Sequence, residues 1–128
     1  NLPSLNNYQI NVNKSAFDLI IENLIANSCE HGVEGYNITI HINISDNIES
    51  IIIEYHDTGK GFEECGIEKV ERWTRGIFTD EELRKDKGLG FWMIQQACDF
   101  IGFEFIRNWG KQTNNEAFKP TFQFVYRK

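Results

Sequence analysis

Hydrophobic residues recur at helical spacing in two long segments of the chain. The first segment begins near Lys14, and its stripe contains one hydroxyl residue among apolar ones: Phe17, Ile20, Ile21, Leu24, Ile25 and Ser28. Asn13 is a suitable cap before it, and Gly32 is a suitable stop after it. In the second segment, Leu89 to Ile101, the same spacing runs up to Gly102. Both segments are predicted to be amphipathic helices with one buried face.

Alternating or β-branched segments predict strands elsewhere. The predicted strands are Tyr8 to Val12, Ile38 to Ile44, Ile51 to Tyr55, Phe103 to Asn108 and Pro120 to Tyr126. Short polar turns separate two pairs of them, which favours hairpins. The predicted fold class is therefore α/β, a two-layer sandwich in which a mixed, mostly antiparallel sheet carries helices on one face. A doubly wound parallel sheet is the weaker alternative, because only one connection has the strand–helix–strand form with a long helix.

The segment from Phe62 to Lys87 is charged and weakly periodic. Two short helical pieces are predicted within it, near Ile67 to Trp73 and near Asp80 to Lys85. Because long irregular connections in a compact domain are usually functional, we expect this segment to be a mobile loop or lid.

The composition indicates one soluble globular domain that spans residues 1–128. Hydrophobic residues make up 41% and charged residues 25%, which argues against disorder. The formal net charge of -6 argues against nucleic acid as a partner. No apolar run approaches the roughly 18 residues of a membrane span, so we expect no direct membrane contact. Three cysteines without metal-type spacing favour a reducing, cytoplasmic location. Because the chain starts at Asn1 rather than methionine, we expect a piece of a longer protein that can itself be membrane-anchored.

Three polar residues on the first predicted helix suggest a metal site. Asn23, Asn27 and His31 are four residues apart, so they share one face of the helix. From the border of the apolar stripe, an asparagine can present its amide oxygen to Mg²⁺. A solvated polar face is the ordinary alternative.

Two glycine-containing turns suggest a ligand with a ring and phosphates. Asp57 ends an apolar strand and precedes Gly59 and Gly61, so a ring can approach the backbone while the carboxylate accepts a hydrogen bond from an exocyclic amine. An ordinary Asx turn explains the same residues. The run K-G-L-G at 87–90 opens the second helix, whose free N–H groups favour phosphate. A flexible helix start is the alternative there.

In this order and context, these segments resemble the motifs of the gyrase, Hsp90, histidine kinase and MutL superfamily. Glu22 to His31 (ENLIANSCEH) resembles its N box, Asp57 to Gly61 (DTGKG) its first glycine box, and Gly88 to Gly90 its second. Glu71 to Gly76 (ERWTRG) is similar to the end of the F box of histidine kinases, a stretch that the other branches generally lack. The resemblance spans Tyr8 to Tyr126 and favours the histidine kinase branch.

The resemblance implies a Bergerat-type fold with ATP and Mg²⁺ as its ligands and the lid over ATP. On this basis Asn27 binds Mg²⁺, Asp57 accepts the adenine amine, and Gly59 and Gly61 frame the ring. The residues expected near the phosphates are His31, Arg75, Lys87, Gly88, Leu89 and Gly90. Asn23 and Arg75 are the candidate catalytic residues, with Arg75 reaching toward the terminal phosphate. Asn23 stands where clamp ATPases of the superfamily carry a water-activating glutamate.

The implied activity is that of the catalytic domain of a sensor histidine kinase. Such a domain converts ATP to ADP by donating the γ-phosphoryl group to a histidine of a separate dimerisation domain, with a response regulator downstream. Within this chain, His31 ends a helix while His41 and His56 lie in predicted strands, so none is a suitable acceptor. The phosphorylated histidine is expected on the separate domain.

Two departures from the family keep alternatives open. Glu30 stands where the family often has Lys or Arg, so His31 or Lys87 is expected to supply that phosphate contact. The late G-T-x-F stretch is replaced by K-P-T-F, with Pro120 at the threonine position. The alternatives are an anti-sigma-factor-type serine kinase or binding module, a clamp ATPase of the same fold, and a degenerate nucleotide-binding regulatory domain.

Overall fold

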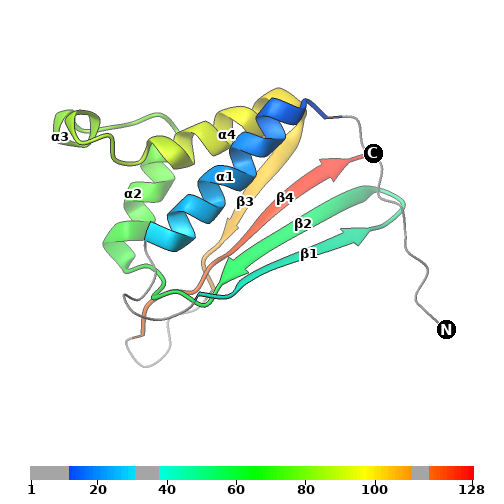
Figure 1. Ribbon diagram of the computed structural model, residues 1–128, viewed down its shortest axis with the longest axis horizontal. Coiled ribbons are helices and arrows are strands. Elements are labelled where there is room, and N and C mark those ends of the chain that lie inside the picture. The colour runs from blue at the N-terminus through cyan, green and yellow to red at the C-terminus, as the bar shows by residue number, and fades with distance from the viewer. Residues whose placement is uncertain (1–11, 31–37, 111–115) are drawn as a thin grey trace.

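The computed structural model describes residues 12–30, 38–110 and 116–128. The elements follow one another as α1 (Lys14–Glu30), β1 (Ile40–Asp46), β2 (Ser50–Asp57), α2 (Glu64–Thr74), α3 (Asp80–Arg84), α4 (Leu89–Ile101), β3 (Phe103–Asn108) and β4 (Thr121–Arg127) (Figure 1). The two predicted amphipathic helices are confirmed as α1 and α4. The predicted strands after residue 37 are confirmed as β1 to β4. The predicted strand Tyr8 to Val12 and the predicted stop at Gly32 lie outside the described residues, except for Val12.

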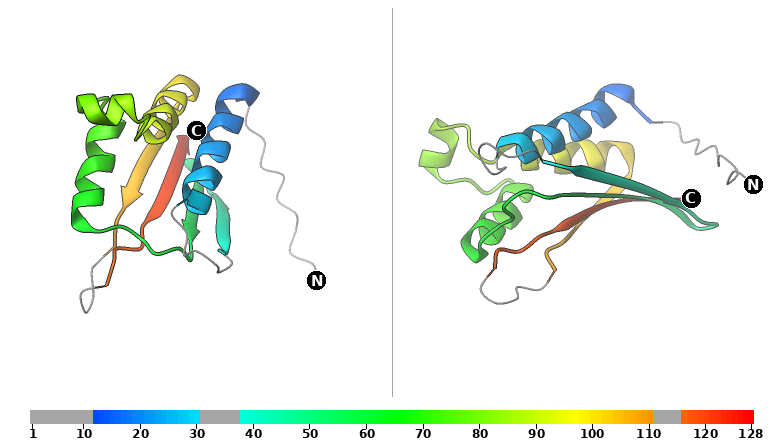
Figure 2. Two further views of the ribbon diagram at one scale, coloured as in Figure 1. Left: turned by 60° about the vertical axis from the view of Figure 1, so that its left-hand side comes forward. Right: turned by 60° about the horizontal axis from the view of Figure 1, so that its bottom comes forward.

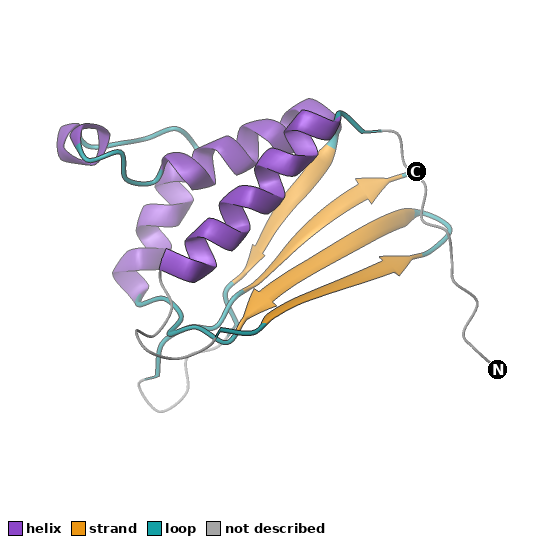
Figure 3. Cartoon of the chain, viewed as in Figure 1, coloured by secondary structure: helices purple, strands orange, loops and turns teal. Residues whose placement is uncertain are grey.

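The strands form one open sheet in the order β1-β2-β4-β3 (Figure 3). Each of its three neighbouring pairs is antiparallel. In register, Tyr55 of β2 lies opposite Ile42 of β1 and Phe122 of β4. The predicted α/β sandwich is therefore confirmed. The doubly wound parallel alternative is wrong, because the tight turn after β1 and the return of β4 both reverse the chain direction.

Helices α1 and α4 lie side by side over one face of the sheet, which Figure 2 shows from two further directions. Ile20 and Leu24 of α1 and Ile94 and Cys98 of α4 are at most 2% exposed. They pack with buried residues of strands β2, β3 and β4: Ile53, Tyr55, Phe103, Phe105, Phe122 and Phe124. Burial raises the pKa of the Cys98 thiol to about 12, so this cysteine acts as a packed apolar residue. Within the described ranges, no helix has both the length and the apolar character of a membrane span.

Two details of the predicted burial are wrong. The stripe on α1 is narrower than its spacing predicts, because Ile20, Leu24 and Ser28 are buried while Ile25 is 39% exposed. Alternation along a strand such as β1 usually indicates one buried face, yet Ile42 and Ile44 are nearly half exposed. Strand β1 is the outer strand of the described sheet, and of its apolar side chains only Ile40 packs against the core.

The segment between β2 and α4 is folded into helices rather than an irregular loop. The predicted helical pieces are confirmed as α2 and α3, which extend to one side of the α1–α4 layer in Figure 1. Glu71 of α2 accepts hydrogen bonds from Arg107 of β3, at 2.9 Å from Nε and from Nη2, and from Trp109 Nε1 at 2.8 Å. Arg72 pairs through both of its terminal nitrogens with Glu82 of α3. Charged contacts therefore tie α2 to the sheet and α3 to α2.

Candidate functional site

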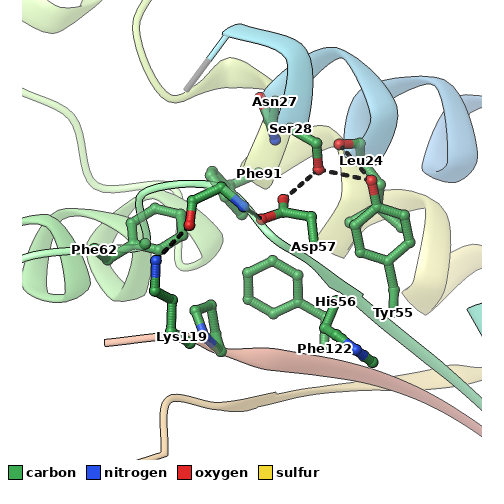
Figure 4. A pocket seen from close by; sticks show the side chains of 13 residues that line it. Leu24, Asn27, Ser28, Tyr55, His56, Asp57, Phe62, Phe91, Lys119 and Phe122 are labelled. Carbon is green, nitrogen blue, oxygen red and sulfur yellow. Dashed lines mark hydrogen bonds between the residues drawn. The ribbon is translucent and has the colours of Figure 1, made fainter. Parts of the chain in front are cut away.

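A pocket that is open to solvent lies between α1, the end of β2, the start of α4 and the start of β4. The wall has an apolar part, chiefly Leu24, Tyr55, Phe62, Phe91 and Phe122. Its other lining residues are Asn27, Ser28, His56, Asp57, Gly59, Gly61, Lys119 and Pro120 (Figure 4). An apolar cavity with a few convergent polar groups suits a flat, partly polar ring.

Asp57 supplies the carboxylate of this pocket. One carboxylate oxygen, Oδ1, accepts from the backbone N–H of Gly59 at 2.8 Å, and Oδ2 accepts from Ser28 Oγ at 2.6 Å. The bond to Gly59 is the Asx turn that the sequence offered as the alternative explanation of this motif. Since each carboxylate oxygen has a second lone pair, Asp57 makes this turn and can still accept a hydrogen bond from a ligand.

Two buried hydroxyl groups lie behind Asp57. Ser28 Oγ is 2.7 Å from the hydroxyl oxygen of Tyr55, and that hydroxyl lies 3.1 Å from the carbonyl oxygen of Leu24 (Figure 4). Burial raises the pKa of the Tyr55 hydroxyl. The sequence prediction missed both residues as parts of a site. The available signal was the serine within an otherwise apolar helical stripe.

The glycine turn after Asp57 is packed against the segment that precedes β4. Gly61 has φ +78°, and a Cβ atom there would lie 2.3 Å from the carbonyl oxygen of Phe118. Phe62 and Phe118 exchange backbone hydrogen bonds of 2.8 Å, and the Lys119 ammonium donates to the carbonyl oxygen of Gly59. The sequence prediction also missed Lys119. Pro120 does line the pocket, although it cannot donate a hydrogen bond there.

The predicted metal-binding face of α1 meets the start of α4. A Cβ atom built on Gly90 would lie 3.0 Å from Asn23 Oδ1 and 3.5 Å from Asn27 Oδ1. Among the described residues, the Asn27 side-chain nitrogen is buried without a hydrogen-bond partner. Since the two ends of an amide are assigned from their partners, this orphaned group is free to present oxygen or nitrogen to a ligand. Asn23, by contrast, donates from Nδ2 to the carbonyl oxygen of Leu19 at 2.8 Å.

None of the described residues that were predicted to contact phosphate lines the pocket. Gly88 is the N-cap of α4 with φ +85°, and the Trp73 ring occupies the space that a Cβ atom would take, at 2.3 Å. Lys87 and Arg75 are exposed, and neither they nor Leu89 belong to the pocket wall. Arg75 is the C-cap of α2 in the ERWTRG stretch. His31 lies outside the described residues, and nothing is described of the Glu30 side chain.

The two described histidines are strand residues, as predicted. His41 of β1 and His56 of β2 are register partners, and their rings stack with centroids 4.5 Å apart. Neither lies in a helix.

Comparison with known proteins gives one family and two similar folds. A family model described as histidine kinase-, DNA gyrase B- and HSP90-like ATPase matches residues 13–122. The catalytic domain of the histidine kinase ThkA, in a nucleotide-free form, is 19% identical with a TM-score of 0.65, covering 91% of this chain and 69% of that one. The mycobacterial sensor histidine kinase MprB is 14% identical with a TM-score of 0.60, covering 90% and 72%. No curated protein sequence matches this chain significantly.

Proposed function

The chain belongs to the family of histidine kinase-, DNA gyrase B- and HSP90-like ATPases, and we propose that it is the ATP-binding catalytic domain of a sensor histidine kinase. In this role it donates the γ-phosphoryl group of ATP to a histidine on a separate dimerisation domain. Residues 1–128 form one domain, and residues 62–87 are its ATP lid. The solved histidine kinase domains with the same fold support this choice within the family.

The pocket over Asp57 is the proposed adenine site. Its aromatic and aliphatic wall removes the ring from water, while the Asp57 carboxylate accepts a hydrogen bond from the exocyclic amine. Gly59 and Gly61 keep the turn beside the ring free of side chains. The Lys119 side chain, which also lines the pocket, holds that turn through the Gly59 carbonyl.

The junction of α1 and α4 is the proposed metal and phosphate site. The residues present fit Mg²⁺, because the Asn27 side-chain nitrogen is buried without a partner among the described residues, and the absence of a side chain at Gly90 lets the start of α4 lie close to the Asn23 and Asn27 amides. Asn27 would hold the ion, which supplies neutralisation of phosphate charge when bound. The first backbone N–H groups of α4, at Leu89 and Gly90, lack helical partners and suit phosphate oxygens. The side chains proposed to reach the phosphates are those of Arg75, Lys87 and His31.

The hydrogen bond and position of the Asn23 side chain are the observation that favours phosphoryl transfer to histidine over hydrolysis of ATP. Its amide is held by the Leu19 carbonyl and faces Gly90, at the place where a water-activating carboxylate would act. An amide cannot accept the proton of an attacking water molecule. Glu22 is exposed and lies about 100° away around the helix. ATP would thus stay intact until a histidine is brought in line with the terminal phosphate.

The proposed partners follow from this chemistry. They are the dimerisation domain that carries the acceptor histidine and a downstream response regulator, in a cytoplasmic setting. The ERWTRG stretch, which forms the second half of α2 and its C-cap, favours this role over an anti-sigma-factor-type serine kinase. The next experiment distinguishes the proposed kinase from the remaining alternative, a clamp ATPase.

Steady-state phosphate release by the purified domain tests the proposal. We expect the unmodified domain to bind Mg-ATP yet release phosphate very slowly, and Asn23→Glu to release it faster because a carboxylate base is then present. Glu22→Gln is the matched control on the same helical turn and should leave the slow rate unchanged. Rapid turnover by the unmodified domain that Glu22→Gln abolishes would favour the clamp ATPase instead.

A further inference from the structure

The hydroxyl pair behind Asp57 has no part in the function proposed so far. Ser28 and Tyr55 are 5% and 2% exposed, so their polar groups are withdrawn from water. A buried hydroxyl must be paired to avoid a desolvation cost, and an alanine and a phenylalanine would fill these positions without it. The two hydroxyls pair with each other, and Ser28 also pairs with the Asp57 carboxylate, the one carboxylate of the pocket.

The protons in this network point toward Asp57. A carboxylate only accepts, so the single Ser28 proton lies on the 2.6 Å contact with Asp57 Oδ2. Ser28 then has only lone pairs left for Tyr55, and the single Tyr55 proton therefore lies on the 2.7 Å contact between the two hydroxyls. The Leu24 carbonyl lies farther from the Tyr55 hydroxyl, at 3.1 Å, so it is the weaker acceptor for that proton. Hydrogen bonds aligned in one direction strengthen one another.

Two donors from different elements fix the plane of the Asp57 carboxylate. Ser28 belongs to α1 and holds Oδ2, whereas the Gly59 N–H belongs to the turn after β2 and holds Oδ1. Loss of the Ser28 donor would leave one anchor, so the carboxylate could rotate about its side-chain bond. Ser28 also follows Asn27 directly, so the same helical turn orients the base acceptor and the proposed metal ligand.

We propose that Ser28 and Tyr55 are positioning residues that aim the Asp57 carboxylate at the exocyclic amine of the base, and so set the preference for adenine. This inference rests on the proposed nucleotide site and adds to it the residues that determine base selectivity. Neither hydroxyl needs to touch the nucleotide. Their effect passes through Asp57, and it therefore depends on whether the ligand has an amine.

Binding of two nucleotides to three variants tests the inference. The ligands are Mg-ATP and Mg-purine riboside triphosphate, which differs from ATP by the missing amine. For Ser28→Ala we expect affinity for ATP to fall roughly tenfold, the loss of about one hydrogen bond to a charged group, while affinity for the purine analogue changes by less than about twofold. Tyr55→Phe should lower ATP affinity less, and the double variant should lose no more than Ser28→Ala. Ser15→Ala, an exposed serine of the same helix, is the control.

The outcomes separate the inference from the proposed function. Equal losses for both nucleotides would mean that the hydroxyls only support the fold, and no loss for either would also overturn the inference while leaving the ATP site intact. A wild-type domain that binds neither nucleotide would instead overturn the proposed function. If Ser28→Ala does not fold, Tyr55→Phe, which keeps the buried ring, carries the same comparison.

Discussion

Gly61 and Gly102 share a left-handed backbone conformation but differ in their surroundings. Their φ angles are +78° and +80°. A Cβ atom at Gly61 would collide with the Phe118 carbonyl, which belongs to the backbone and cannot move aside, whereas nothing lies within 4 Å of the same atom at Gly102. The two positions therefore separate the cost of backbone conformation from the cost of the close approach beside the pocket.

We expect Gly102→Ala to lower the free energy of unfolding by about 1 to 2 kcal/mol, the cost of a left-handed conformation with a side chain. Gly61→Ala should lower the free energy of unfolding by about 1 to 3 kcal/mol more than Gly102→Ala does, because overpacking against Phe118 adds to the cost of the backbone conformation. Urea unfolding of both variants measures the difference. Equal losses would show that the Gly61 turn moves away from Phe118 without cost.

Single residues were the least predictable part of the site. Asp57, Gly59, Gly61 and Asn27 could be chosen from the sequence because each belongs to a motif with fixed spacing, and all four line the pocket. Lys119 could not, because it meets the glycine turn across 60 residues of sequence. Arg75 and Lys87 are exposed and lie outside the pocket wall, so their contact with phosphate stays a prediction.

At the scale of elements, α3 depends on one carboxylate. Glu82 accepts from both terminal nitrogens of Arg72 at 3.1 Å, and it forms a capping box with Thr79 at the start of α3. Hydrogen bonds from Arg72 lower the pKa of Glu82 to about 2, with a further contribution from the Thr79 backbone. Helix α3 has five residues, too few to be stable alone, so this contact holds it in place.

The lowered pKa gives α3 a pH dependence of known sign. The carboxylate titrates near 4.3 in an unfolded segment and near 2 when paired, so its contribution is fully present above about pH 5 and is lost as the pH falls toward 2. We expect hydrogen exchange of the α3 amides to lose protection as the pH falls from about 5 to about 2, relative to the amides of α4. Glu82→Gln should be weakly protected throughout. The same pH dependence in Glu82→Gln would contradict the role of this pair.

The order and type of the elements were largely predictable. The helical spacing, the alternation and the glycine stops all mark local backbone structure, and they placed α1, α4 and the strands well. The lid segment was less predictable, because Arg72 and Glu82 are ten residues apart and only the folded chain brings them together. The exposure of Ile42 and Ile44 likewise depends on which helix covers which strand.

For the whole molecule, the lid should respond to nucleotide unevenly. Helix α2 is tied to the sheet through Glu71, whose pKa is lowered chiefly by its hydrogen bonds from Arg107. Residues 75–87 are held to α2 by the pair of Glu82 with Arg72, and they carry Arg75 and Lys87, which are proposed to reach the phosphates. We expect hydrogen exchange to show added protection at 75–87 with saturating Mg-ATP and little change in α2. Equal protection of residues 75–87 with and without nucleotide would contradict the proposal that this segment is an ATP lid.

The central claim is that ATP binds with its adenine amine on Asp57, and calorimetric titration of Mg-ATP into the wild-type domain and Asp57→Asn tests it most directly. Asparagine keeps the shape of the side chain but replaces the anionic acceptor with an amide. Asp99→Asn, an exposed change on α4, is the matched control. We predict that Asp57→Asn weakens binding by roughly 1.5 to 3 kcal/mol while the control does not. Unchanged ATP affinity in a folded Asp57→Asn domain would contradict the account.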